Sequence, residues 1–84
     1  MAVAVQMFEQ VHASLVRVLG SDHPDTLAAA LNLGRVYYAV GRLTDAGALL
    51  TDTVARGERM LAPADPLTKA ARESLAVIIG AGAQ

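Results

Sequence analysis

Hydrophobic residues recur along the chain in four segments, at the three- and four-residue spacing of amphipathic helices. Short stretches rich in glycine, proline and aspartate separate these segments. The pattern predicts helices near residues 3–19, 24–40, 44–61 and 66–80. The connection between the second and third helices is only about three residues long, which forces neighbouring helices to run antiparallel. The sequence therefore predicts an all-α fold built from helix hairpins.

Small and polar residues mark the expected ends of these helices. Gly20 and Gly41 follow the first and second helices, where glycine can adopt the left-handed backbone that terminates a helix. Asp65 precedes a proline and is expected to cap the fourth helix. Thr44 is the predicted cap of the third helix.

A segment of the chain nearly recurs. Residues 23–29 read HPDTLAA and residues 65–71 read DPLTKAA, so the second copy begins 42 positions after the first. Self-similarity at this spacing is typical of stacked helical repeats. The positions at which this repeat recurs divide a single domain, residues 1–84, into three parts. These are a half repeat (1–22), a full repeat (23–62) and a second half repeat (63–84).

The second and third predicted helices carry alternating small and large residues in a fixed order: Leu33-Gly34-x-x-Tyr37, then Gly41-Arg42-Leu43-x-x-Ala46 and Leu50. Gly34 and Ala46 are small where two helices are expected to cross closely. This order resembles the tetratricopeptide repeat signature, and the repeat of about 42 residues resembles the kinesin-light-chain type. The resemblance implies a short tetratricopeptide-type α-solenoid that acts as a non-catalytic protein interaction module, as a segment of a longer repeat protein.

In proteins of this family, the first helix of each repeat lines a groove that binds a peptide or a helical partner. In the present chain this groove would lie between the second and fourth helices. Asn32, Arg35 and Tyr38 project from the second helix at three-residue steps, and Ser74 and Val77 occupy the matching positions of the fourth. Asn32 could pair with a peptide main chain, and Arg35 with a carboxylate. The alternative is that these residues only solvate an exposed helix face.

Both ends of the predicted array lack a neighbouring helix. Repeats bury their faces against neighbours, and contiguous apolar faces are rarely left exposed. We therefore expect homo-oligomers when the chain is present as this segment, with possible helix exchange. The candidate self-association residues are Phe8, Leu75, Ile78 and Ile79. Two alternative functions follow from the sequence: an oligomerisation or scaffold element, and a sensor segment of a larger signalling ATPase or regulator.

Composition narrows the function classes further. The formal net charge is -1 and the seven lysine and arginine residues are dispersed, which disfavours nucleic-acid binding. No run reaches the ~18 apolar residues of a membrane span. The chain also lacks the features of a secretory signal, so a cytoplasmic location is expected. Cysteine is absent, and no phosphate loop or nucleophile motif appears.

Asp22, His23 and Asp25 cluster before the second helix and could ligate a divalent metal. Acidic residues beside a proline are, however, the ordinary chemistry of a helix N-terminus. Either Asp22 or His23 is therefore expected to cap that helix, and no metal site, cofactor or catalytic residue is predicted. His12 is interpreted as a partly buried packing residue.

Overall fold

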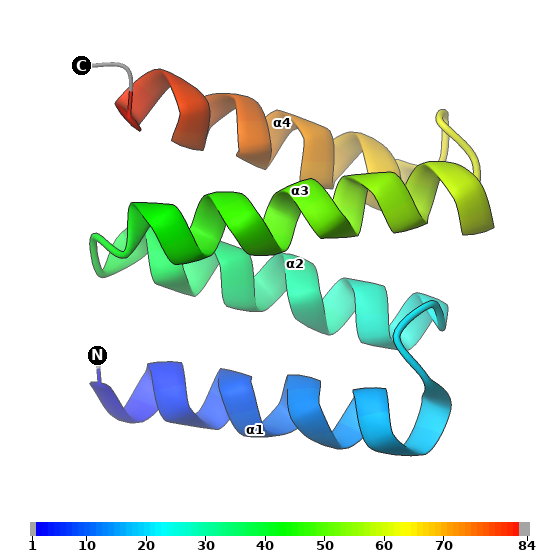
Figure 1. Ribbon diagram of the computed structural model, residues 1–84, viewed down its shortest axis with the longest axis horizontal. Coiled ribbons are helices and arrows are strands. Elements are labelled where there is room, and N and C mark those ends of the chain that lie inside the picture. The colour runs from blue at the N-terminus through cyan, green and yellow to red at the C-terminus, as the bar shows by residue number, and fades with distance from the viewer. Residues whose placement is uncertain (1, 83–84) are drawn as a thin grey trace.

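The chain folds into four antiparallel helices in the computed structural model, which describes residues 2–82 and shows no strand in that range. The helices are α1 (Ala2–Leu19), α2 (Pro24–Ala39), α3 (Leu43–Met60) and α4 (Pro66–Gly82). In Figure 1, α1 and α3 form the nearer layer and α2 and α4 the farther one. Helix α2 packs against all three others, and the molecule measures 33 × 29 × 16 Å. The predicted all-α hairpin architecture is confirmed.

Two glycines end helices as the sequence predicts. Gly20 and Gly41 have φ angles of +90° and +84°, in the left-handed region. After α2, the Arg42 N–H donates to the Tyr37 carbonyl at 2.8 Å, which closes a Schellman motif around Gly41. This tight turn leads directly into α3, which begins one residue before Thr44. The prediction that Thr44 caps α3 is therefore wrong, because the turn has already fixed the start of the helix.

Side chains cap the N-termini of α2 and α4. Asp65 Oδ1 accepts from the Leu67 N–H at 2.9 Å, as predicted. For α2 the sequence left Asp22 and His23 open, and the structure places His23 as the cap. Its Nδ1 accepts from the Asp25 N–H at 3.0 Å.

The core lies where α2 and α3 cross. A Cβ placed on Gly34 would lie only 2.6 Å from Leu50 Cγ, so the two helices approach more closely than alanine would allow. Ala46 and Leu50 are completely buried beside this crossing. The prediction that Gly34 and Ala46 permit a close approach is confirmed. The buried cluster comprises Leu31, Ala46, Leu50, Ala71 and Ile78.

The apolar residues of α4 do not share one open face. Ile78 is only 5% exposed and belongs to the core, and half-buried Leu75 packs against the same cluster. The expectation that Ile78 lies on an uncovered surface is wrong, because α4 already packs against both α3 and α2. Ile79 is 62% exposed, and Phe8 of α1 is also exposed.

Candidate binding groove

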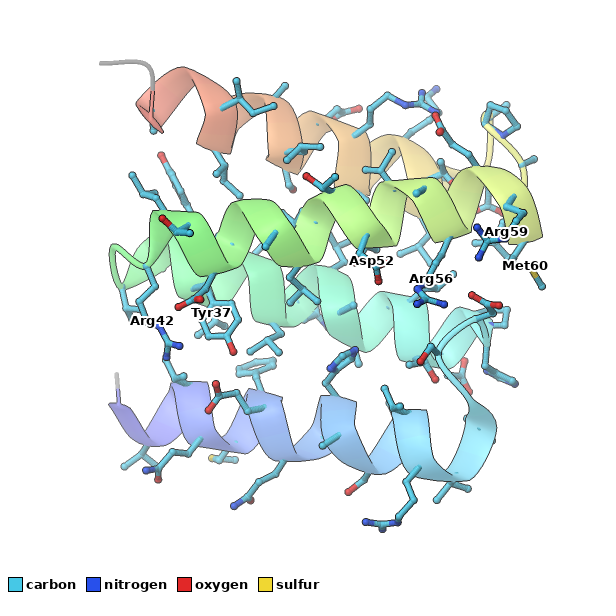
Figure 2. The ribbon with its side chains drawn as sticks, in the orientation of Figure 1. Tyr37, Arg42, Asp52, Arg56, Arg59 and Met60 are labelled. Carbon is cyan, nitrogen blue, oxygen red and sulfur yellow. The ribbon has the colours of Figure 1, made fainter. Side chains whose placement is uncertain are left out.

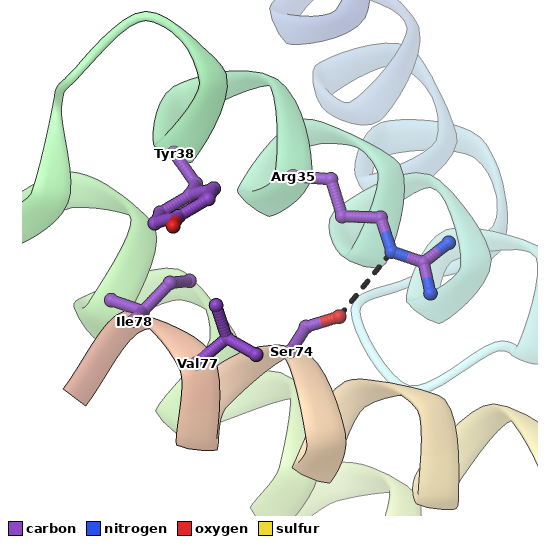
Figure 3. Close-up of a pocket in the computed structure, with 5 residues that line it drawn as sticks. All are labelled: Arg35, Tyr38, Ser74, Val77 and Ile78. Atoms are coloured by element: carbon purple, nitrogen blue, oxygen red, sulfur yellow. Dashed lines mark hydrogen bonds between the residues drawn. The ribbon is translucent and has the colours of Figure 1, made fainter. Parts of the chain in front are cut away.

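A hollow of about 210 Å³ lies between α2 and α4. Figure 3 shows side chains from both helices converging on it, with Arg35 and Tyr38 on the α2 side. The α4 side contributes Ser74, Val77 and Ile78. The 42-residue repeat explains this convergence, since Ser74 and Val77 repeat the positions of Asn32 and Arg35 on a helix packed alongside α2.

One predicted groove residue stands apart from this hollow. Asn32 is exposed on α2 but does not line the hollow, which begins at Arg35, three residues further along the helix. The Arg35 Nε–H donates to Ser74 Oγ at 3.3 Å and connects the two walls. The structure therefore brings together the predicted residues Arg35, Tyr38, Ser74 and Val77.

The chemistry of the hollow is mixed. Tyr38 and Val77 are exposed and give it apolar walls, and buried Ile78 extends it toward the core. Arg35 places a permanent cation at its edge. A hollow of this kind can accept an apolar side chain whose neighbour carries a hydrogen-bonding or negatively charged group.

A polar cluster that the sequence did not predict connects α1 with the end of α2 and the α2–α3 turn. It consists of Glu9, Tyr37 and Arg42. The Tyr37 hydroxyl donates to Glu9 Oε2 at 2.6 Å, and the Arg42 guanidinium lies 4.5 Å from the centre of the Tyr37 ring. Burial, and next the bond to Glu9, raise the pKa of Tyr37 to about 12. Figure 2 shows Tyr37 and Arg42 on the side of α2 that faces α1. Arg42 therefore supports helix packing at this turn.

A second cluster fixes the loop before α2. Asp22 Oδ1 accepts from Arg56 Nη1 at 2.7 Å and from Arg59 Nη2 at 3.3 Å. Arg56 Nε also donates to Asp52 Oδ2 at 2.8 Å, and Figure 2 labels Asp52, Arg56 and Arg59. The hydrogen bond from Arg56 is the main cause that lowers the pKa of Asp22. The Asp22 carboxylate is thus engaged by arginines. Within residues 2–82 no group of three or more potential metal ligands comes together.

A shallower hollow of about 420 Å³ lies between α1 and α3. His12 is half-buried at this hollow, as the sequence suggests, and burial lowers its pKa while the charge of Asp52 partly opposes that effect. The residues that line the hollow are His12, Leu33, Tyr37, Asp45, Ala48, Leu49 and Asp52.

Comparison with known proteins identifies the repeat. A family model of the tetratricopeptide repeat matches residues 1–59, which is most of the chain. The chain belongs to the tetratricopeptide repeat family. It is similar to Protein KINESIN LIGHT CHAIN-RELATED 3 of Arabidopsis thaliana, with 38% identity over 76 residues. It is also similar to Protein KINESIN LIGHT CHAIN-RELATED 2 of the same plant, with 37% identity over 76 residues. No solved structure matches.

These matches confirm that the repeats are of the kinesin-light-chain type. Tetratricopeptide repeats are protein interaction modules and are generally non-catalytic. Each alignment covers 90% of this chain but only 12% of the relative, so the chain corresponds to a small part of those proteins. Among residues 2–82, no helix has both the length and the apolar character needed to cross a membrane.

Proposed function

We propose that this tetratricopeptide repeat segment binds a peptide or a helical partner in the groove between α2 and α4. The convergence of Arg35 and Tyr38 with Ser74 and Val77 on one hollow supports the proposal. The proposed binding unit follows the repeat phase, with the full repeat (23–62) supplying one wall and the half repeat (63–84) the other.

The chemistry of the groove suggests how a peptide would bind. An apolar side chain fills the hollow beside Tyr38 and Val77, where its burial contributes most of the binding free energy. Arg35 pairs with a carboxylate of the peptide. Exposed Asn32, three residues before Arg35 on α2, donates to and accepts from the peptide main chain.

The proposal is tested by selecting binders from a displayed library of short random peptides and measuring their affinity by fluorescence polarisation. Replacing Asn32 and Arg35 together by alanine is expected to weaken binding at least roughly tenfold, which corresponds to a loss of about 1.4 kcal/mol. Both side chains are exposed, so the melting temperature should move by only a few degrees.

The matched control is Arg17→Ala, which removes an exposed arginine from α1, away from the groove. This variant should bind the selected peptides as the unmodified chain does. If the Asn32 and Arg35 double variant also binds them unchanged, the assignment of the groove is wrong.

A further inference from the structure

Arg35 differs from most arginines of this chain in the partner that it meets. Ion pairs with acidic side chains engage four others: Arg42, Arg56, Arg59 and Arg72. Within residues 2–82 Arg35 forms no such pair, and its Nε–H donates to the neutral hydroxyl oxygen of Ser74 at 3.3 Å. The positive charge of Arg35 therefore remains uncompensated at the edge of the hollow between α2 and α4.

The hydrogen bond to Ser74 engages only one side of the planar guanidinium. A guanidinium carries five N–H donors in a fixed plane, one on Nε and four on the two Nη atoms. With Nε bound to Ser74, the Nη donors have no partner among the described residues. These donors can bind a carboxylate through two parallel hydrogen bonds. The contact with Ser74 thus limits the rotation of the Arg35 side chain and leaves its carboxylate-binding donors free.

The repeat accounts for the position of Ser74. This residue lies 42 positions after Asn32 and lines the hollow from the α4 side. Serine is shorter than asparagine, so position 74 offers a hydrogen-bond acceptor without filling the hollow of about 210 Å³. Figure 3 shows the Arg35–Ser74 pair at one end of the hollow and Tyr38 with Ile78 at the other. The polar and apolar parts of the hollow are therefore separated.

We propose that Ser74 is a positioning residue, which holds the Arg35 guanidinium in the orientation that binds a carboxylate of the peptide. This proposal rests on the proposed function of the groove, because it assigns a role within that site. An exposed arginine samples many rotamers, and binding a ligand restricts them at a cost in entropy. Because Ser74 already restricts Arg35 in the free protein, less entropy is lost when the carboxylate binds.

A purely structural role for this hydrogen bond is the competing explanation. Arg35 is exposed and Ser74 is half-buried, and a hydrogen bond of 3.3 Å in such a place adds little to stability. A structural bond would join α2 to α4 and would affect acidic and neutral peptides alike. A positioning bond acts on peptides that carry the carboxylate. The two roles therefore differ in the preference of the groove for an acidic peptide over its amide analogue.

Two variants of nearly equal shape test the proposal. Ser74→Thr keeps the hydroxyl group, whereas Ser74→Val replaces it by a methyl group on a side chain branched in the same way. Peptides selected on the unmodified chain are compared, by fluorescence polarisation, with analogues in which glutamate is replaced by glutamine or aspartate by asparagine. The unmodified chain should prefer the acidic peptide roughly tenfold. Ser74→Val should reduce this preference at least roughly threefold, and Ser74→Thr should retain most of it.

Arg35→Ala shows whether Ser74 acts through the arginine. This variant should remove the preference for the acidic peptide. Adding Ser74→Val to Arg35→Ala should then change the preference no further, because the group that Ser74 positions is absent. If Ser74→Val lowers the preference equally with and without Arg35, the positioning role is wrong.

Nuclear magnetic resonance measures the positioning in the absence of peptide. The Nε–H resonance of Arg35 is assigned by its loss in Arg35→Ala. Its hydrogen should exchange with water more slowly than that of exposed Arg17, because it is hydrogen-bonded. Ser74→Val should raise the exchange rate to that of Arg17, and Ser74→Thr should leave it slow. Equal exchange rates in the two Ser74 variants would overturn the positioning role.

The experiments separate a failure of this role from a failure of the groove. Selected peptides that depend on Asn32 and Arg35 but bind Ser74→Val and Ser74→Thr with the same acidic preference overturn the positioning role and leave the groove in place. Selected peptides that contain no acidic residue have the same consequence. If the double variant of Asn32 and Arg35 binds the peptides unchanged, the groove assignment fails and the positioning role fails with it.

Discussion

Replacing Gly34 by alanine tests the close crossing of α2 and α3. The new methyl carbon would lie 2.6 Å from Leu50 Cγ and 2.7 Å from Leu50 Cδ2. Carbon atoms that do not clash stay about 3.5–4.0 Å apart. Leu50 is completely buried, so its side chain has no open space into which it could turn. Either the leucine leaves its preferred rotamer or the two helices separate.

The expected loss of stability follows from two opposing effects. Overpacking of a well-filled core costs about 1–3 kcal/mol, and the branch point Cγ of Leu50 is among the atoms displaced, which places the cost in the upper half of that range. Alanine is favoured over glycine within a helix by about 1 kcal/mol. The free energy of unfolding should therefore fall by about 1–2 kcal/mol, and the melting temperature by roughly 5–15 °C.

Gly47 of α3 provides the matched control, since it also lies within a helix. A Cβ at this position would lie 3.8 Å from Ile78 Cγ2, an ordinary contact distance. Gly47→Ala should therefore stabilise the protein by about 1 kcal/mol through helix propensity alone. Both variants are compared by urea unfolding followed by circular dichroism at one fixed protein concentration.

A double variant tests the same contact by a second route. Leu50→Ala alone should cost about 2–5 kcal/mol, because it leaves a cavity. When Gly34→Ala is added, the new methyl group occupies part of that space, so the double variant should be about 1–2 kcal/mol more stable than the sum of the single effects predicts. If Gly34→Ala instead stabilises the chain as much as Gly47→Ala does, the close crossing is refuted.

Two further predictions concern side-chain hydroxyl groups. Thr68 Oγ1 is buried and finds no hydrogen-bond partner among the described residues, so Thr68→Val should stabilise the protein by about 1 kcal/mol in thermal melts. Thr53→Val should not stabilise the protein, because the Thr53 hydroxyl donates to the Leu49 carbonyl at 2.8 Å. Equal increases in stability for the two variants would contradict the conclusion that, of these two hydroxyls, only that of Thr68 is without a partner among the described residues. The pKa of Tyr37, raised to about 12 from its ordinary 10.0, means that the folded chain retains a proton that the unfolded chain loses. This contribution to stability is complete below pH 10 and is lost as the pH rises toward 12, and Tyr37→Phe should flatten that decline in denaturation measured across this range.

The fold could be predicted from the sequence because its signals are local. Proline and glycine fix where helices begin and end within a few residues, whatever the rest of the chain does. The error at Thr44 shows where such signals compete. A threonine is a good N-cap, but the turn at Gly41 closes onto Tyr37 and starts α3 before Thr44 is reached.

The groove could be predicted because the 42-residue repeat relates each position of α2 to an equivalent position of α4. Translating the exposed positions of α2 by 42 residues locates Ser74 and Val77, which the structure places across the hollow from Arg35 and Tyr38. The sequence places Ile78 at an open end because it does not show that α4 packs against two helices. Because α4 packs against both α2 and α3, the side chain of Ile78 is buried in the core.

The polar clusters could not be predicted, because they join residues far apart in the sequence. Tyr37 and Glu9 are separated by 28 positions, and Arg56 and Asp22 by 34. No local spacing marks such pairs, in contrast to the i,i+4 pair of Arg56 with Asp52. Their geometry depends on how α1 is placed against α2, which is decided by the packing of the helices.

Helix α2 contacts each of the other three helices with a different side of its surface. Gly34 faces α3 in the core, Tyr37 faces α1, and Arg35 lines the hollow shared with α4. At 100° per residue, these neighbouring positions point in separate directions, so a change on one face leaves the other two largely undisturbed. Alanine at the exposed positions of Asn32 and Arg35 removes polar groups from the groove without opening a cavity. A loss of peptide binding in that variant would therefore reflect the groove itself and not a weakened fold.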